Sequence, residues 1–325
     1  MEEKRYGLLG RHLGHSWSVP IHAALGRRDY ALFEVEPEDL EAFLQQKDLG
    51  GFNVTMPYKT AVLPFCDALD PLARACGSVN TLLWEGDKLL GYNTDAQGFC
   101  AMAERAGIDF LGKKLLILGN GGVSSTVQAM GERLGAREIV QLSRSGPQGY
   151  DSLPRHADAD ILVNATPVGM YPEGGESLVD LHQFPVCSGV LDLIYNPRRT
   201  ALILQAEALS IPCSDGLPML VAQAVAAEEL FYGEPLPEEC VERILWDLRW
   251  RNTNMVLIGM PGCGKSTVGK ILAAMTAREA IDLDAKIAEK EGMSVPDILR
   301  TKGEDYFRDL EQRQGNNGFV FFYHK

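Results

Sequence analysis

The chain has 325 residues, of which 46% are hydrophobic and 23% charged, a composition typical of a globular protein of two or three domains. Its formal net charge of −13 disfavours binding to nucleic acid, which needs a basic surface. No apolar stretch approaches the roughly 18 residues of a membrane span, and the charged start "MEEKRYGLLG" is unlike a signal peptide. The seven cysteines are scattered without zinc spacing. We therefore expect a cytoplasmic protein with no membrane partner.

Short apolar runs alternate with helical stretches along the chain, which predicts an α/β fold with parallel sheets. The region up to residue 95 carries four candidate strands, at 6–10, 30–36, 50–55 and within 80–94. The last of these predicts a hairpin that turns at Glu85–Gly86–Asp87.

The second region begins with a predicted helix over 96–107 and continues as a doubly wound sheet. Its candidate strands lie within 113–122, 138–145, 159–167, 188–195 and 211–216. Helices are predicted over 217–233 and 237–251, and a polar joint, "NTN", then leads to a third region. The predicted organisation is a first domain of residues 1–95 plus 217–251, a second, Rossmann-type domain of residues 96–216, and a third region of residues 254–325.

A glycine cluster follows the strand "KLLILG" and precedes an apparent helix. Gly119, Asn120, Gly121 and Gly122 form it, and Ser124 stands where the full dinucleotide motif has its last glycine. A tight turn alone is an alternative. The strand, glycine turn, helix and strand together favour a pyrophosphate site at the helix N-terminus.

The end of the next strand reads "LSRS", which places Ser143, Arg144 and Ser145 where an NAD site usually has an acidic residue. A guanidinium and two hydroxyls suit a 2′-phosphate, so this segment favours NADP(H). An exposed arginine without a ligand is the alternative.

Polar groups also gather in the first region. Ser16 and Ser18 lie in a loop after the first strand, Lys59 follows Pro57, and Asp95 stands at the start of a predicted helix. Taken singly, these residues are typical of a loop, a solvated charge and a helix cap.

These segments together resemble the shikimate dehydrogenase family. The matching stretches are "GHSWSVPIH", "GFNVTMPYK", "GSVNT", "GYNTDAQGF", "GNGG", "LSRS", "NATPVGM", "DLIYNP" and "DGLPMLVAQA", in the family's order over residues 5 to about 235. The resemblance implies reversible reduction of 3-dehydroshikimate to shikimate by NADPH, with Lys59 and Asp95 as the catalytic pair. It leaves open which of the two moves the proton.

The resemblance also implies roles for other residues. Ser16, Ser18 and Tyr195 would bind the substrate carboxylate, and Thr55, Asn80, Thr94 and Gln223 would read its hydroxyls. Thr166 and Gly216 would line the nicotinamide side. One departure is that the family's S-x-S-P reads Ser16-Trp17-Ser18-Val19-Pro20 here, which puts the geometry of the serine loop in doubt.

The third region opens on "MVLIGMPGCGKSTVGK", which fits the phosphate-cradling P-loop G-x-x-x-x-G-K-[ST]. This predicts a site for ATP and Mg²⁺, in which Lys265 contacts phosphates and Ser266 is a ligand of Mg²⁺. The P-loop residues are Gly259, Gly262, Gly264, Lys265, Ser266 and Thr267.

The segment after the P-loop resembles the shikimate kinase family, with Asp284 and Arg308 at positions that would bind shikimate. The region is shorter than a typical domain of roughly 100–150 residues. We therefore expect a truncated kinase without efficient phosphoryl transfer, whose strand "GFVFF" stands where the family's next strand begins. The alternatives are a bifunctional dehydrogenase–kinase, a noncatalytic binding module, and a quinate-using or NAD-preferring enzyme. The oligomeric state is left open between monomer and homodimer.

Overall fold

The computed structural model describes residues 4–14, 16–46, 48–172, 174–237, 239–251, 253, 255–260, 263–314 and 320–324. The chain divides into two compact units, Met1–Leu245 and Trp246–Lys325. The division falls inside helix α9 (Glu239–Arg251) and not at the polar joint beyond that helix. The finer division of the chain into three domains stays a prediction.

The first sheet of the larger unit contains six described strands in the order β2-β1-β3-β5-β6-β4. These are β1 (Arg5–Gly10), β2 (Ala31–Glu34), β3 (Leu49–Val54), β4 (Ala68–Leu69), β5 (Thr81–Glu85) and β6 (Lys88–Tyr92). The sheet is mixed, because β5 runs antiparallel to both β3 and β6. The hairpin predicted at Glu85–Gly86–Asp87 accounts for the pairing of β5 with β6, since Gly86 takes a positive φ of 62° and reverses the chain within two residues. The antiparallel pairing of β5 with β3 was not predicted.

The second sheet is parallel, as predicted, with the described order β11-β10-β9-β7-β8. Its strands are β7 (Lys114–Leu118), β8 (Glu138–Leu142), β9 (Ile161–Asn164), β10 (Gly189–Asp192) and β11 (Cys213–Ser214). Every residue of β7 is buried, since a central parallel strand is covered on both faces. Ligands of such sheets bind beyond the carboxyl ends of the strands.

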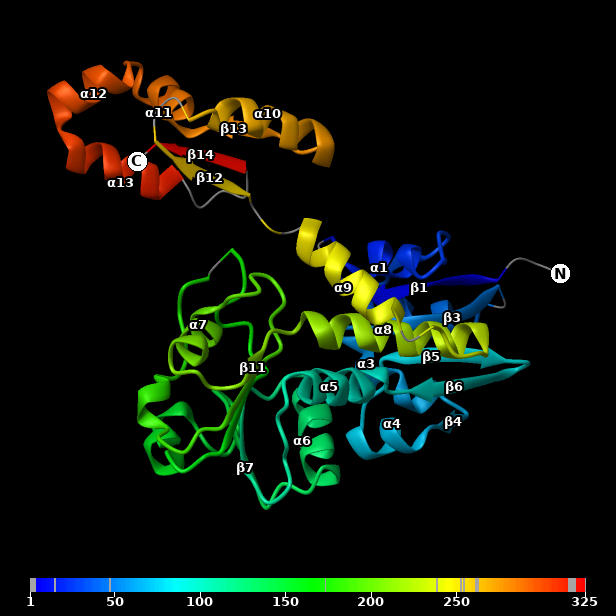
Figure 1. The fold of residues 1–325 in the computed structure, drawn as a ribbon. Helices are drawn as coiled ribbons and strands as arrows, with labels where there is room; N and C mark the ends of the chain where they lie inside the picture. The colour runs from blue at the N-terminus through cyan, green and yellow to red at the C-terminus, as the bar shows by residue number, and fades with distance from the viewer. Residues whose placement is uncertain are drawn as a thin grey trace. The chain divides into compact units, whose positions relative to one another are not determined.

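Helices of the larger unit join the two sheets (Figure 1). α5 (Thr94–Arg105) and α8 (Leu217–Tyr232) pack on each other between the strands of the first sheet and those of the second. The remaining helices are α1 (Ser18–Ala24), α2 (Leu40–Leu44), α3 (Tyr58–Ala61), α4 (Pro71–Cys76), α6 (Ser124–Arg133) and α7 (Ala201–Ala208). Among the described residues, no helix combines the length and the apolar character needed to cross a membrane.

The smaller unit holds a parallel sheet with the described order β12-β14-β13. Its elements are β12 (Val256–Gly259), α10 (Lys265–Thr276), β13 (Ala280–Asp282), α11 (Leu283–Glu291), α12 (Val295–Lys302), α13 (Glu304–Gln314) and β14 (Val320–His324). The strand predicted from "GFVFF" is present from Val320 onward, whereas Gly318 and Phe319 lie outside the described residues. A small core of Leu283, Ile287, Ile298, Phe307 and Leu310 joins α11, α12 and α13.

Candidate active site

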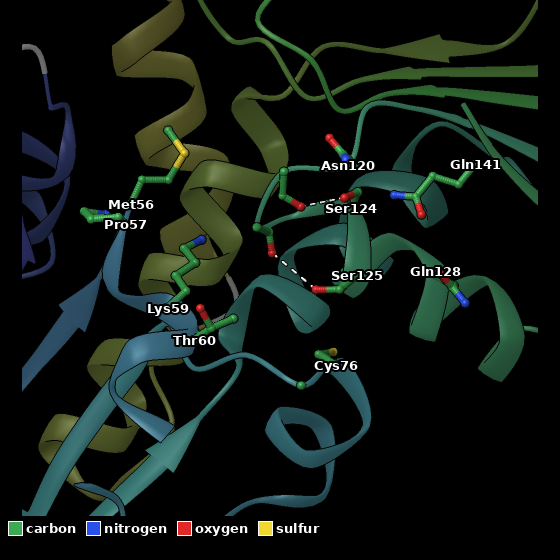
Figure 2. A pocket seen from close by; sticks show the side chains of 13 residues that line it. Met56, Pro57, Lys59, Thr60, Cys76, Asn120, Ser124, Ser125, Gln128 and Gln141 are labelled. Carbon is green, nitrogen blue, oxygen red and sulfur yellow. Dashed lines mark hydrogen bonds between the residues drawn. The ribbon is translucent and has the colours of Figure 1, made fainter. Parts of the chain in front are cut away.

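Two cavities open at the carboxyl ends of the strands of the larger unit. One, of about 530 Å³, lies between the glycine cluster and the segment that carries Lys59. Figure 2 shows Met56 and Lys59 on one side of this cavity and Asn120, Ser124 and Ser125 on the other. The other cavity, of about 560 Å³, is lined by loops of the first sheet and by α8. Met56 and Lys59 line both cavities, so Lys59 lies where they meet.

The two predicted catalytic residues form an ion pair at this junction. Lys59 lies in α3, directly after β3, and its Nζ is 2.5 Å from Oδ2 of Asp95. Asp95 lies in the first turn of α5, where the helix dipole favours a carboxylate. The N-cap itself is Asn93, whose side chain accepts a hydrogen bond from the Ala96 amide. Asp95 is therefore free of the capping role and faces the lysine, and both side chains are largely buried, at 17% and 11% exposure.

Three of the four predicted hydroxyl-binding residues, Asn80, Thr94 and Gln223, form a hydrogen-bonded group beside the ion pair. Asn80 donates to Thr94 Oγ1 at 2.9 Å and to Gln223 Oε1 at 3.4 Å, and its Oδ1 accepts from the Thr94 amide at 2.6 Å. Thr55, Asn80 and Gln223 line the larger cavity. These three polar side chains come from the end of β3, the start of β5 and α8.

Ser16, Ser18 and Tyr195 line the same cavity. The Ser16 hydroxyl accepts a hydrogen bond from the Ser18 amide at 3.2 Å, so its proton points elsewhere. The displaced Pro20 is accommodated because it lies in the first turn of α1, where a backbone N–H has no intrahelical acceptor. Trp17, between the serines, packs against the Tyr195 ring with centroids 5.0 Å apart.

The glycine cluster has the geometry of a phosphate loop. Gly119 has φ of 106°, and a Cβ there would lie 2.8 Å from the Ala165 carbonyl oxygen. At Gly121 a Cβ would meet open space, and α6 begins three residues later at Ser124. A Cβ at Gly122 would lie 3.9 Å from Lys59 Cδ. The backbone is thus bare where the helix N-terminus faces the cavity.

The predicted 2′-phosphate clamp lies at the end of β8. Arg144 and Ser145 are exposed, whereas Ser143 is only 3% exposed, which leaves the first two as the accessible groups. Among the described residues, Arg144 has no hydrogen-bond or ion-pair partner. Asn120 donates to Ser145 Oγ at 3.2 Å, and this contact ties the glycine cluster to the clamp.

The two residues predicted for the nicotinamide side are fixed by contacts with the ends of neighbouring strands. Thr166 follows β9, and its amide and hydroxyl both donate to Asn164 Oδ1, at 3.0 and 2.7 Å. Gly216 lines the larger cavity, and its Cβ position is filled by the Leu193 backbone, so only glycine fits there.

The P-loop of the smaller unit is described except for Pro261 and Gly262, so the predicted Gly262 lies outside the described residues. Gly264 has φ of 88°, and α10 begins at Lys265. The Lys265 ammonium donates to the carbonyl oxygens of Gly259 and Met260, at 2.8 and 2.7 Å. Ser266 and Thr267 are exposed at the first turn of the helix.

The two residues predicted to bind shikimate in this unit lie on different helices. Asp284 is in the first turn of α11, which Asp282 caps. Arg308 on α13 pairs with Glu304 at 3.1 Å and with the buried Glu311 at 2.7 Å. The guanidinium is therefore engaged by carboxylates of its own helix.

Several polar residues of the site were not singled out from the sequence. Gln141 lines the smaller cavity and donates to the Gly119 carbonyl at 2.9 Å. Asn53 lines the larger one, and Asn164 and Asp192 end the apolar strands β9 and β10. A polar residue that closes a buried strand is the sequence signal that could have found the last two.

Comparison with known proteins places the chain beside shikimate dehydrogenases. Residues 8–82 match the family model described as shikimate dehydrogenase substrate binding domain, and residues 261–317 match the shikimate kinase model. The shikimate dehydrogenase (NADP(+)) of Methanopyrus kandleri is 38% identical over 75% of this chain and 95% of its own.

Solved structures extend the likeness to the fold. A chorismate mutase/shikimate 5-dehydrogenase fusion protein from Clostridium acetobutylicum superposes with a TM-score of 0.73 at 33% identity, covering 77% of this chain and 98% of that one. The Thermus thermophilus shikimate 5-dehydrogenase in complex with NADP(H) and shikimate gives a TM-score of 0.67 at 30% identity, covering 75% and 99%. The ion pair, the glycine cluster and these matches lead to one conclusion: the chain belongs to the shikimate dehydrogenase family.

Proposed function

We propose that the larger unit catalyses the reversible reduction of 3-dehydroshikimate to shikimate with NADPH. The observation that carries the proposal is the Lys59–Asp95 ion pair, which lies where the two cavities meet. A group in that place can act on a bond formed between a ligand in one cavity and a ligand in the other. The curated relatives with this name support the same reaction.

Lys59 and Asp95 fit the proton side of such a reaction. NADPH, when bound, supplies the hydride. As the carbonyl carbon of the substrate is reduced, negative charge develops on its oxygen, and the ammonium of Lys59 stabilises that charge. The Asp95 carboxylate keeps the ammonium charged and oriented, and either group can pass the proton.

The residues around the smaller cavity fit NADP(H). We assign the pyrophosphate to Gly119, Asn120, Gly121 and Gly122, because they line or adjoin the smaller cavity directly before the N-terminus of α6 and the glycines leave the backbone bare there. Arg144 and Ser145 are accessible for a 2′-phosphate, with Ser143 packed beneath them. Thr166 and Gly216 would lie on the nicotinamide side.

The larger cavity fits a small polyhydroxylated acid. Ser16, Ser18 and Tyr195 form one group that suits a carboxylate. Thr55, Asn80 and Gln223 also line this cavity and suit hydroxyls, since each side chain can both donate and accept. We assign Thr94 to the same group through its hydrogen bonds to Asn80, because Thr94 is buried and does not line the cavity. We propose accordingly that residues 1–95 and 217–251 make the substrate domain and residues 96–216 the NADP domain.

The proposal is tested by following NADP reduction with shikimate as substrate. Purified protein should turn over, and Lys59→Ala should lose about 10²–10⁴-fold in kcat, the range expected for a proton-transfer group. Lys113→Ala is the matched control, because Lys113 forms only a long, partly exposed pair with Asp160 at 3.7 Å. Absence of turnover, or a Lys59→Ala variant as active as wild type, would reject the assignment.

For the smaller unit we propose nucleotide binding without efficient phosphoryl transfer to shikimate. The P-loop geometry supports a phosphate site, in which Lys265 would exchange its two carbonyl acceptors for phosphate oxygens and Ser266 would bind Mg²⁺. Thr267, next to Ser266, belongs to the same ATP site. Asp284 and Arg308 are the candidate ligands of shikimate. The engagement of Arg308 by Glu304 and Glu311 argues against transfer.

ATP binding and ATP consumption separate the two parts of this second proposal. Wild type should bind ATP with Mg²⁺, and Lys265→Ala should weaken binding, whereas Lys270→Ala on the exposed side of α10 should not. Shikimate-dependent ATP consumption that disappears in Lys265→Ala would instead establish a second enzyme on the chain.

A further inference from the structure

A buried carboxylate lies at the carboxyl end of β10, at the edge of the sheet where the cavities open. Asp192 is 0% exposed and accepts three hydrogen bonds from described groups. Its Oδ1 accepts from Asn164 Nδ2 at 2.9 Å and from the Ile194 amide at 3.1 Å, and its Oδ2 accepts from Thr200 Oγ1 at 2.6 Å. The donors come from the end of β9 and from the segment that follows β10, so a single side chain connects the two.

On the β9 side, Asp192 fixes the orientation of the Asn164 amide. The Nδ2 of Asn164 is directed to Asp192 and, at 3.3 Å, to the Val168 carbonyl. Its Oδ1 is consequently turned toward Thr166, where it accepts from both the amide and the hydroxyl. If the amide of Asn164 rotated, Thr166 would lose both of these acceptors.

On the β10 side, Ile194 and Thr200 hold the loop that carries Tyr195. Ile194 is also bonded through its carbonyl to the Gly216 amide at 2.9 Å, so the same loop sets the position of Gly216. Tyr195 and Gly216 both line the larger cavity. If the Asp192 carboxylate moved, residues on the nicotinamide side and residues that bind the substrate carboxylate would therefore both shift.

We propose that Asp192 is a positioning residue, whose carboxylate holds the loop of Thr166 and the loop of Tyr195 in one arrangement. The inference rests on the proposed function for the roles of these two loops. Asp192 itself does not line either cavity, so it acts through Asn164, Ile194 and Thr200.

The positioning role of Asp192 also depends on the charge of its carboxylate. Burial, and to a smaller extent the nearby Asp215, raises the pKa of this carboxyl from 3.8 to about 6 despite the three hydrogen bonds. Arg198 faces Asp215, with Nε 3.1 Å from Oδ2, and offsets part of that repulsion. Protonation of Asp192 removes one hydrogen-bond acceptor, so all three hydrogen bonds to the carboxylate form only above about pH 6.

The sign of the stability effect distinguishes positioning from a merely structural role. Because the pKa in the folded protein lies above that of the unfolded chain, the free energy of unfolding falls as the pH rises from about 4 to about 6. Asp192→Asn keeps the shape and removes the charge. We therefore expect it to melt no lower than wild type at neutral pH, while its activity falls.

The experiment compares wild type, Asp192→Asn, Thr200→Val and Thr200→Ser in the full chain. For Asp192→Asn we expect kcat/KM to fall about 10–100-fold at neutral pH, since displacements of about 1 Å can cost 10²-fold. Part of this loss should be a higher KM for shikimate. The fall of kcat/KM below about pH 6 that we expect in wild type should be absent from Asp192→Asn. Thr200→Val should show a smaller loss of the same kind, and Thr200→Ser, which keeps the hydroxyl, should restore it.

Hydrogen exchange gives a measurement that does not depend on turnover. Amides within 164–168 and 193–200 should exchange faster in Asp192→Asn than in wild type. If wild type does not oxidise shikimate but these amides still respond, the proposed function fails and the positioning role stands. Unchanged exchange, full activity in Asp192→Asn, or an activity loss that only follows a lower melting temperature would each overturn the positioning role.

Discussion

The two glycine loops of this chain differ in what surrounds them. Both follow a strand and precede a helix, yet β7 before the first loop is buried throughout, whereas Val256 and Ile258 of β12 before the second are 51% and 71% exposed. The first loop faces a cavity whose opposite side comes from the first sheet. The sharper motif therefore stands on the less buried strand, and motif strength and completeness of a site are separate properties.

Lys265 and Lys59 also differ in what surrounds them. Lys265 belongs to its own loop, and its ammonium is satisfied by carbonyls of that loop. Lys59 comes from outside the glycine cluster and is paired with Asp95, which lies 36 positions further along the chain. A loop motif specifies where phosphate can bind, whereas the reacting group has to be delivered by the tertiary fold.

We expect the largest difference in activity when Asp95 and Asp284, each in the first turn of a helix, are replaced in turn by asparagine. Asp95→Asn should lower kcat for shikimate oxidation about 10²–10⁴-fold, because Lys59 loses its counter-ion at the reacting end of the cavity. Asp284→Asn in α11 should leave that rate unchanged. Steady-state assays of the two variants measure both, and a similar loss in each would show that the regions are not functionally separate.

A smaller effect concerns cofactor choice. Arg144→Gln should reduce the preference for NADP over NAD by about 10–100-fold, as expected when a charge-assisted hydrogen bond of about 1.5–3 kcal/mol is lost. The ratio of kcat/KM for the two cofactors measures it. Arg137→Gln is the control, since Arg137 pairs with Asp160 at 3.2 Å instead. An unchanged ratio would assign the 2′-phosphate to other groups.

The smallest effect compares a glycine from each loop. Gly119→Ala and Gly264→Ala both place alanine at positive φ, which costs about 1–2 kcal/mol. At Gly119 the new Cβ also meets backbone, whereas at Gly264 no atom of the described residues lies within 4 Å of it. We expect Gly119→Ala to raise the KM for NADP by about tenfold and to lower the melting temperature more than Gly264→Ala does. Equal melting shifts in the two variants would show that the collision at Gly119 is relieved.

Much of the larger unit was predictable because its signals are local. The apolar run of β7, the turn at Gly86 and the glycine cluster are each written within a few neighbouring residues. The antiparallel placement of β5 beside β3 was not, since strand pairing joins segments about 30 residues apart and no local pattern selects the partner.

The candidate site shows the same limit. Lys59 and Asp95 were found through family motifs, and their contact follows from the fold. The burial of Ser143 was missed because the accessible side of a strand end depends on what packs there. Asp192 was missed because its importance lies in donors from two separate segments, which only the folded chain brings together.

The position of Lys59 on the wall of both cavities has a thermodynamic consequence. A ligand in either cavity removes water from the same ammonium group, so the binding free energies of cofactor and substrate are coupled through it. Coupling of this kind is reciprocal: whatever factor shikimate applies to the affinity for NADP, NADP applies to the affinity for shikimate. Because Lys59 lines both cavities, cofactor and substrate each act as an effector of the other's binding.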